Sequence, residues 1–292
     1  MKKRRLFFVA MVFLAIVAFF IFIHDENEVQ NEPFDSEVNN LPDEEVQMEI
    51  DNSEPESSSQ NEKKSEQLNL IEWKPIEGKW EPSGSPSECP NLIFYSPVDL
   101  KKATSVLYPG QYRGGEYKAH GGFRFDKETT NEIEVRAPFD GYVWRGARYF
   151  ASGEIQYTVE IVNECGIIHR LGHLLELSPE FNSLAQHLPE PKELDSRLYP
   201  FEKFINVKRG DLIATKVGVQ KNVFMDWGAY DVRKENEASK NAAYQEKFEN
   251  MKDSAFYAVC WIDNLPADQQ GIVKSLPAAD SVSGKQSDYC KE

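Results

Sequence analysis

An uninterrupted apolar segment near the N-terminus constrains this chain more than any other feature. It runs over residues 6–23 without a charged residue and follows four basic residues at positions 2–5. A helix of this length, at about 1.5 Å per residue, nearly spans the hydrocarbon core of a bilayer. Basic residues before such a helix favour a cytoplasmic N-terminus. We therefore predict a cytoplasmic tail over residues 1–5 and a transmembrane helix over residues 6–23.

The alternative for this segment is a cleaved signal peptide. The apolar core of a signal peptide is shorter, about 7–15 residues, and a cleavage site with small residues follows it. Here Phe22 and Ile23 run straight into His24 and Asp25, which favours an uncleaved anchor. Under both interpretations the rest of the chain is exported. We expect a single-pass membrane protein that is attached to the membrane by its N-terminal anchor and has an extracytoplasmic C-terminal domain.

The next stretch, residues 24–69, has the composition of an acidic disordered linker. It contains 15 acidic residues and two lysines and holds few large apolar residues, so it cannot bury enough surface to offset the entropy of ordering. The whole chain has a net charge of −15, the first five residues contribute +4 and the linker contributes −13. This leaves −6 for residues 70–292. With no basic patch in sight, nucleic acid is not an expected partner.

The remaining residues, 70–292, are enough for one well-buried domain. All four cysteines lie within it, and an even number in an exported chain predicts two disulfides. Three pairings are possible. Our first choice joins Cys260 to Cys290, which closes the C-terminal segment on itself, and Cys89 to Cys165. Metal binding by cysteine is disfavoured because no CxxC pair occurs.

The hydrophobic pattern of this domain predicts mainly strands. Short apolar or alternating runs bounded by turn residues are typical of strands. These runs are residues 92–95, 132–135, 141–144, 156–162, 166–171, 211–214 and 223–227. A helical pattern covers residues 237–251, a second short helix is expected over residues 267–275, and residues 177–204 contain the prolines and glutamates expected of a long loop.

The order of several short motifs resembles that of the lysostaphin-like (LytM-type) zinc metallopeptidase family. The likeness covers residues 111–231, and an Ala-Pro-x-Asp-Gly-x-Val turn and a Lys-Arg-Gly-Asp turn match best. The motifs occur, in order, at residues 117–123, 137–143, 171–174, 207–213 and 224–227. The resemblance implies a mainly β, duplicated-hybrid-motif (lysostaphin-like) β-sheet domain, to which the sequence adds one or two short C-terminal helices and the preceding transmembrane helix.

The resemblance also implies a site. Members that cut peptidoglycan cross-links use a His-x-x-x-Asp pair and a later His-x-His pair, of which the first His, the Asp and the last His hold zinc. Two further histidines, one in a middle segment and the first of the later pair, assist the attacking water. Three protein ligands leave one open position, where Zn²⁺ lowers the pKa of its bound water to about 7.

Carried over to this chain, the family's site is degenerate. His120 matches the first ligand, but Arg124 stands where the aspartate belongs. His173 matches the assisting histidine of the middle segment, as a catalytic remnant. Phe224 and Asp226 align with the later pair, and no histidine follows position 187. Because a guanidinium stays protonated and cannot ligate a metal, we expect no cofactor here.

Other arrangements of these residues remain open. His120, Asp126 and Asp226 would make an N/O set that suits zinc, if a metal is bound. In the metal-free alternative, the guanidinium of Arg124 takes the place of the cation and pairs with Asp226. His169 lies four residues before His173 on the same predicted strand, so alternation places both on one face, where we expect His169 to be a packing residue.

Three hypotheses for the function follow. In the first, the domain is a non-catalytic, metallopeptidase-like module that binds or scaffolds at the cell envelope, with a vestigial cleft around His120, Arg124, Asp126 and Asp226. In the second, it is an active cell-wall zinc metalloendopeptidase with altered ligands. In the third, it is an envelope protein of unrelated role that shares only the fold. The partners expected beyond the membrane are peptidoglycan or an envelope protein.

Overall fold

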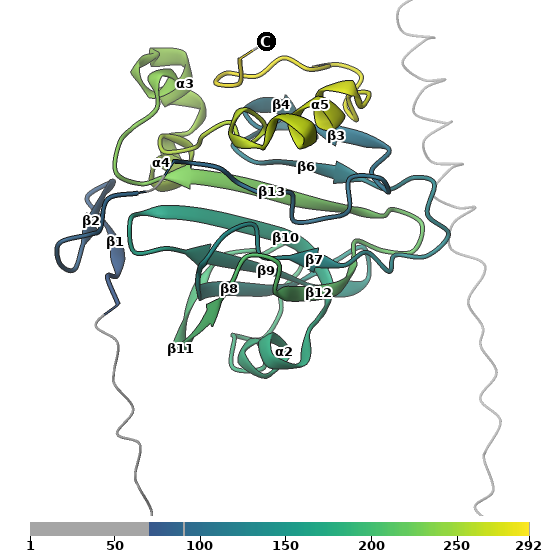
Figure 1. Ribbon diagram of the computed structural model, residues 1–292, viewed down its shortest axis with the longest axis horizontal. Helices are drawn as coiled ribbons and strands as arrows, with labels where there is room; N and C mark the ends of the chain where they lie inside the picture. Colours follow the sequence, from purple (N-terminus) through teal and green to yellow (C-terminus); the bar gives the residue numbers. More distant parts are fainter. Residues whose placement is uncertain (1–69, 90, 292) are drawn as a thin grey trace, which may run out of the picture. The chain divides into compact units, whose positions relative to one another are not determined.

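The computed structural model describes residues 70–89 and 91–291, which belong to one compact unit (Figure 1). The predicted cytoplasmic tail, transmembrane helix and acidic linker lie outside the described residues. Within the described part, no helix has the length and apolar character needed to cross a membrane.

An antiparallel sheet dominates the described part. Its main path has the order β11-β8-β9-β10-β13-β6-β3, while β12 pairs with both β10 and β7. These strands are β3 (Ser105–Leu107), β6 (Gly121–Arg124), β7 (Val135–Arg136), β8 (Gly141–Ala151), β9 (Glu154–Val162), β10 (Ile167–Leu177), β11 (Tyr199–Val207), β12 (Leu212–Val217) and β13 (Phe224–Asp231). The mainly β prediction is therefore confirmed at the level of a β-rich, antiparallel domain.

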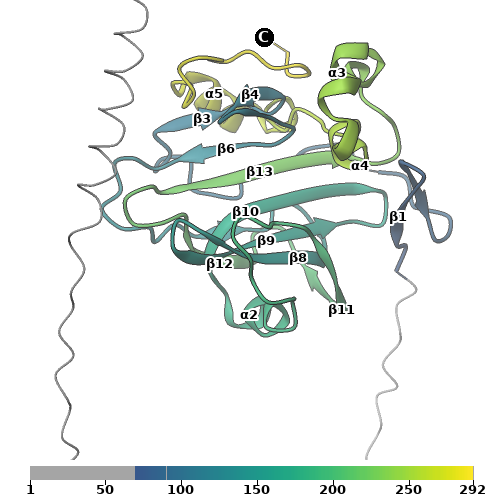
Figure 2. The same ribbon diagram turned by 180° about the vertical axis from the view of Figure 1, so that it is seen from behind.

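Smaller elements surround the sheet. Two hairpins, β1 (Trp73–Ile76) with β2 (Lys79–Pro82) and β4 (Gln111–Arg113) with β5 (Glu116–Lys118), form separate two-stranded sheets. Helix α2 (Pro179–Ala185) contacts β8 and β10. The C-terminal part contains η1 (Glu237–Lys240), α3 (Ala242–Lys247), η2 (Glu249–Met251), α4 (Lys252–Ala255), η3 (Ile262–Asn264) and α5 (Ala267–Ser275). Figure 2 shows, from behind, α5 beside β3 and β4, and α2 on the opposite side of the sheet.

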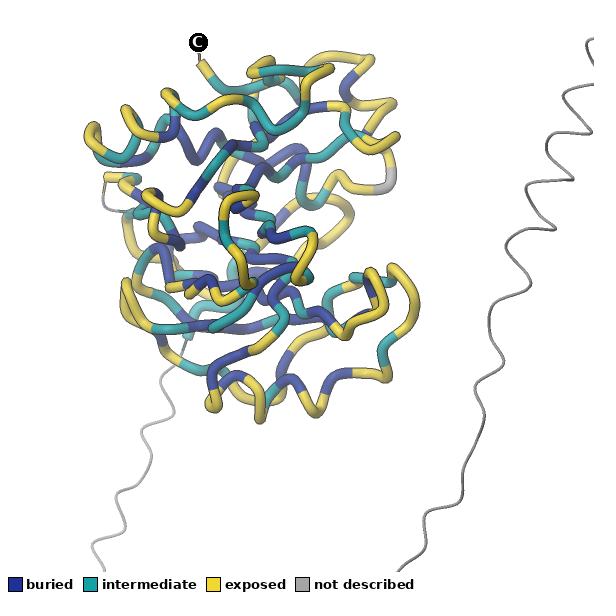
Figure 3. Tube along the Cα trace, turned by 90° about the vertical axis from the view of Figure 1, so that its right-hand side faces the viewer, coloured by how far each residue is buried: buried dark blue, intermediate teal, exposed yellow. Residues whose placement is uncertain are grey.

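The core divides between the two faces of the sheet. Along β9 and β10 the side chains alternate, so that Leu171 and Ile161 join one buried cluster while Ile168 and Val162 join another. This alternation follows from the two-residue period of a strand. Figure 3 shows buried segments in the interior of the domain and exposed segments mainly at its periphery.

Several predicted elements differ from the observed ones. Residues 92–95 form no strand, because their backbone groups bond to turns and loops, as Phe94 N–H does to the carbonyl of Asn264. The predicted strand at residues 132–135 is reduced to β7. The predicted loop over residues 177–204 contains α2 and the start of β11. The predicted helix over residues 237–251 is broken into three pieces, whereas α5 has the predicted bounds.

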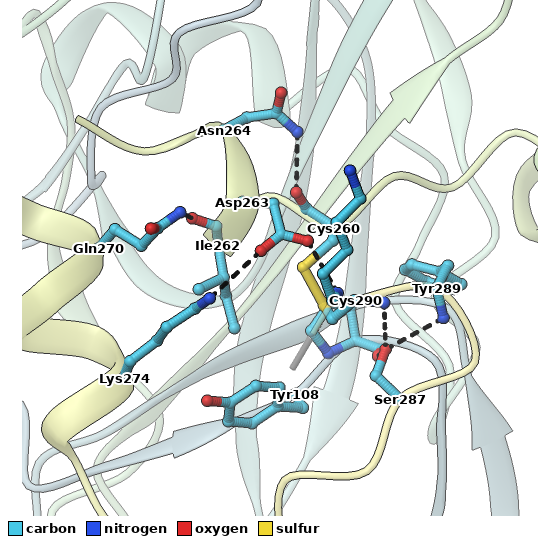
Figure 4. The surroundings of a disulfide bond; sticks show 12 residues. Tyr108, Cys260, Ile262, Asp263, Asn264, Gln270, Lys274, Ser287, Tyr289 and Cys290 are labelled. Carbon is cyan, nitrogen blue, oxygen red and sulfur yellow. Dashed lines mark hydrogen bonds and ion pairs between the residues drawn. A yellow bond between two sulfur atoms is a disulfide. The ribbon is translucent and has the colours of Figure 1, made fainter. Parts of the chain in front are cut away.

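Both predicted disulfides are present. Cys89 bonds to Cys165, which ties the segment before the sheet to the β9–β10 turn, and Cys260 bonds to Cys290 (Figure 4). Around the second bond, the amide N–H of Cys290 donates to the hydroxyl of Ser287, and the side chain of Asn264 donates to the carbonyl of Cys260. This disulfide fixes the C-terminal segment against the core.

Candidate functional site

Asp226, near the start of β13, is the centre of the candidate site. Its neighbours across both ladders are glycines, Gly172 on β10 and Gly122 on β6. A side chain at Gly122 would bring its Cβ to 2.1 Å from the carbonyl oxygen of Met225, so only glycine fits there. The two glycines leave the space on either side of the Asp226 carboxylate free for side chains from other positions.

Two imidazoles occupy that space. The Nε2 atom of His120 lies 3.0 Å from Oδ2 of Asp226, and the Nε2 atom of His173 lies 3.3 Å from the same oxygen. About a fifth of each of the three side chains is exposed. The structure therefore brings together three of the residues named in the sequence analysis, His120, His173 and Asp226.

His173 reaches this face through a β-bulge. The registers of β10 with β9 and with β12 shift at Leu174, and His173 has a positive φ of 58°. Histidine is among the residues that adopt this left-handed conformation more readily. The extra residue reverses the alternation, so Leu171 and Leu174 both enter the same core cluster while His173 turns to the opposite face. The prediction that His169 and His173 share a face is wrong for this reason.

His169 is instead fully buried within the core. Its Nδ1 atom accepts a hydrogen bond of 2.8 Å from Nε1 of Trp227, and its ring packs against Phe94 and Phe139. Burial lowers the pKa of His169 to about 3. His169 is thus a neutral packing residue at neutral pH, as the sequence analysis expected.

A glutamine that the sequence analysis missed orients His173. The Nδ1 atom of His173 lies 2.6 Å from Oε1 of Gln156, a buried side chain whose amide nitrogen donates to the carbonyl of Ala151. That second bond fixes the amide orientation, so Nδ1 is the donor. Acceptor oxygens, Oε1 of Gln156 and Oδ2 of Asp226, then face both ring nitrogens of His173 and fix the orientation of its ring.

The backbone at His120 is held by two side chains. The guanidinium of Arg113 donates to the carbonyls of His120, at 2.7 Å, and of Tyr108, at 3.0 Å. The hydroxyl of Tyr289 donates to the carbonyl of Ala119. Because Tyr289 precedes Cys290, the Cys260–Cys290 disulfide supports the position of His120.

Electrostatics at the centre are dominated by burial and by the two imidazoles. Burial acts to raise the pKa of Asp226, but the charges and hydrogen bonds of His120 and His173 outweigh it and hold this pKa well below its usual range. Burial lowers the pKa of His120, against the opposing effect of Asp226. Asp226 is therefore ionised at neutral pH and can accept hydrogen bonds from both imidazoles.

Arg124 does not pair with Asp226, so that prediction is wrong. Its guanidinium forms an ion pair of 2.8 Å with Asp126 and donates to Oδ1 of Asn222 at 3.0 Å. Asp126 also accepts from the hydroxyl of Thr104. The two charged residues lie two positions apart on one extended segment, and this local partner competes successfully with the carboxylate on the neighbouring strand.

Phe224 contacts the site directly. Its ring centroid lies 4.3 Å from that of His173, and the guanidinium carbon of Arg124 lies 6.0 Å from the Phe224 centroid. An aromatic ring therefore packs against His173 at the position where the family resemblance implies a second assisting histidine.

The zinc implied by the resemblance does not fit these residues. In the described part of the chain, no group of three or more His, Cys, Asp and Glu side chains is arranged to hold a metal ion. His120 and His173 are turned to the carboxylate of Asp226, and Asp126 is engaged by Arg124. The alternative set of His120, Asp126 and Asp226 is therefore not assembled.

A cleft of about 580 Å³ opens beside His120. Its floor is formed by the sheet, and its walls come from the loop before β11, from hairpin β1–β2 and from the segment around α4. The lining includes Trp80, His120, Arg145, Glu160, Arg170, Leu194, Arg197, Tyr230, Met251 and Asp253. Two other cavities, one from Asn91 to Arg209 and one beside the C-terminal segment, do not include the three central residues.

Apart from His120, the residues that line the cleft were not identified from the sequence. Their signal lies in the strand registers, which pair Arg145 with Glu160 and Glu160 with Arg170 across β8, β9 and β10. A row of charges on one face of a sheet indicates that this face is not simply covered by core. The hairpin between β9 and β10 was predicted, but the pairing of β8 with β9 was not.

Comparisons with known proteins add little to this picture. No family model matches the chain, and no curated protein matches it. A solved structure of Csd3 from Helicobacter pylori is similar over 69% of this chain and 45% of that chain, with 12% sequence identity and a TM-score of 0.32. The chain thus spans less than half the length of that protein. A likeness of this size carries no argument about function.

Proposed function

We propose that the described domain is a non-catalytic binding module, displayed outside the cytoplasm by the N-terminal anchor, whose cleft takes peptide groups of the cell wall. The observation that carries this proposal is the engagement of Asp226 by both His120 and His173, of which His120 also lines the cleft. A hydrolase of the family that the sequence resembles needs its histidine and carboxylate groups for a metal and its water. In this chain the imidazoles of His120 and His173 and the carboxylate of Asp226 contact one another instead.

The cleft itself supports binding. Its volume of about 580 Å³ is typical of a ligand site, and it combines aromatic and charged side chains. Leu194, on its rim, is 73% exposed, which leaves a large apolar side chain available to a ligand. An acidic linker between anchor and domain would keep the module near the wall and raise its effective concentration there.

The test is incubation of the purified full chain with purified peptidoglycan, with zinc added and with a chelator. We expect the chain to sediment with the wall material in both conditions and to release no fragments. Zinc-dependent release of fragments that is lost in His120→Ala or His173→Ala would overturn the proposal in favour of a peptidase. Absence of retention on peptidoglycan would also contradict the proposal. Binding to an envelope protein instead would mean that the partner is a protein and not the cell wall.

A matched pair of variants locates the binding surface. Leu194→Asn removes an exposed aliphatic side chain at the cleft rim, and Val282→Asn removes one that is 91% exposed and does not line the cleft. We expect Leu194→Asn to weaken retention several-fold and Val282→Asn to leave it unchanged. Equal effects would place the binding surface elsewhere.

A further inference from the structure

The charges that line the cleft are mostly paired. Three ion pairs account for most of them: Lys118 with Glu116 at 2.5 Å, Arg145 with Glu160 at 2.7 Å, and Arg197 with Asp195 at 2.5 Å. Two charged residues of the lining remain, the cation of Arg170 and the carboxylate of Asp253. Neither makes an ion pair with any other residue of the described chain.

Arg170 lies on the cleft floor in a row of charges that runs across the sheet. Its register partners are Glu160 on β9 and Gly228 on β13. Arg145 directs two nitrogens to the same oxygen of Glu160, at 2.9 and 2.7 Å, and so engages that carboxylate from the other side. The Arg170 side chain donates a long hydrogen bond of 3.4 Å to the carbonyl of Ser196. A guanidinium has five N–H donors, so most of those on Arg170 remain available.

A phenol hydroxyl lies next to Arg170. A Cβ placed on Gly228 would be 2.5 Å from the hydroxyl oxygen of Tyr230, so that oxygen lies over the glycine that pairs with Arg170. Tyr230 lines the cleft, and its hydroxyl forms no hydrogen bond with the described residues. A guanidinium and a neighbouring O–H donor together are suited to a carboxylate, which accepts through two oxygens.

Asp253 supplies the opposite charge from the cleft wall. The indole nitrogen of Trp80 donates to its backbone carbonyl at 2.6 Å, which fixes the residue without using the carboxylate. Burial raises the pKa of Asp253, against the opposing effects of Arg145 and Arg170. Neither arginine forms an ion pair with Asp253, so an ammonium group from a ligand in direct contact would further offset the cost of burying this carboxylate.

We propose that the cleft recognises a peptide group that carries both a free carboxylate and a free ammonium, with the carboxylate on Arg170 and Tyr230 and the ammonium on Asp253. This inference rests on the proposed peptide-binding function and names the chemistry of its ligand. Both charges are required, because the cleft offers one unpaired group of each sign.

The test uses a set of alanine oligopeptides of two to five residues with free termini, N-acetylated, C-amidated or blocked at both ends. Binding to the purified full chain is measured by calorimetry and by ligand-observed NMR. For the length that fits best, we expect blocking either terminus to weaken binding about tenfold or more. Equal binding of the free and blocked peptides, or no binding at any length, would overturn the inference.

Variants assign each charge to its residue. In Arg170→Gln, amidation of the peptide should no longer matter, while acetylation should still weaken binding. In Asp253→Asn, the reverse should hold. Gly228→Ala should displace the Tyr230 hydroxyl and weaken binding of the free carboxylate without removing a charge. Arg136→Gln and Asp268→Asn, which change exposed charges outside the cleft, are the controls and should bind as the parent does.

The outcome is separable from that of the proposed function. Retention on peptidoglycan together with a lack of charge dependence in the oligopeptide set would reject the charge complementarity and keep the binding module. Loss of charge selectivity in both controls as well as in the cleft variants would also reject the assignment, because it would indicate a general electrostatic effect.

Discussion

At the residue scale, Asp226 determines the chemistry of the site. It accepts from His120 and His173, whereas Arg124 is turned to Asp126. We predict that double-mutant cycles will show coupling of roughly 1–3 kcal/mol between Asp226 and each histidine, within the range for residues in one hydrogen-bond network. The coupling between Asp226 and Arg124 should be clearly smaller. Urea unfolding of the alanine variants gives these energies, and a larger Arg124 coupling would restore the original prediction.

A second residue-scale prediction concerns His169. Its pKa is about 3 when folded and 6.5 ordinarily, because burial disfavours the charged ring. Below pH 6.5 the unfolded chain therefore binds a proton that the folded chain does not, and stability falls by up to about 1.4 kcal/mol per pH unit down to about pH 3. Above pH 6.5 this residue makes no contribution.

His169→Gln tests this dependence, since glutamine does not titrate and can still accept from Nε1 of Trp227. We expect the free energy of unfolding to depend less steeply on pH between about 6 and 4 in the variant than in the parent. The comparison uses the slope, so a constant loss from altered packing does not affect it. Identical slopes would show that His169 is protonated in the folded chain.

At the element scale, the sequence was informative where local pattern and final packing agree. The alternating runs at residues 156–162 and 166–171 became β9 and β10, and residues 267–275 became α5. It was misleading where one residue changes the geometry. The bulge at His173 leaves no mark in the hydrophobic pattern, yet it decides which histidine faces Asp226.

Other differences have equally local causes. In the segment of residues 177–204, prolines and glutamates suggested a loop, but Phe181 and Leu188 bury themselves against the core and allow α2 to form. In residues 237–251, the side chain of Asn241 accepts from the N–H of Ala243 and starts a new helix there. Arg124 was expected to pair with Asp226, but the sequence pattern alone does not say which of two nearby carboxylates its guanidinium will reach.

We predict that the Cys260–Cys290 disulfide stabilises the domain and the segment beside His120. It closes a loop of 30 residues, for which chain entropy implies a stabilisation of roughly 3–4 kcal/mol. The closed segment also donates from Tyr289 to the backbone beside His120. In the double variant Cys260→Ser/Cys290→Ser, we expect the free energy of unfolding, measured with urea, to fall by this amount. We also expect faster hydrogen exchange at residues 108–120.

The other disulfide provides the control for that experiment. Cys89→Ser/Cys165→Ser opens a longer loop, with a sequence separation of 76, at the β9–β10 turn. It should lower stability at least as much but leave exchange at residues 108–120 less affected than the first double variant does. If both variants change exchange at these residues equally, the C-terminal segment has no specific role in holding His120.

At the scale of the whole molecule, the described domain and the N-terminal sequence make a joint argument about location. Two disulfides join all four cysteines, and stable disulfides are typical of exported proteins. The predicted transmembrane helix over residues 6–23, with basic residues before it, likewise predicts that the C-terminal domain is exported. The acidic linker over residues 24–69 would then hold the domain beyond the membrane surface.

We therefore predict that protease added to intact spheroplasts will remove residues 70–292 and leave a short membrane-bound N-terminal fragment. Cleavage should begin within residues 24–69, because a segment with few apolar residues offers a protease an accessible backbone. Antibodies against each end of the chain, used on fractionated membranes, distinguish the fragments, and lysed spheroplasts serve as the control for protease access.

Full protection of the C-terminal domain in intact spheroplasts, with cleavage after lysis, would place it in the cytoplasm. Recovery of a soluble chain that lacks residues 1–23 would instead indicate a cleaved signal peptide, since an uncleaved anchor keeps the intact chain in the membrane fraction.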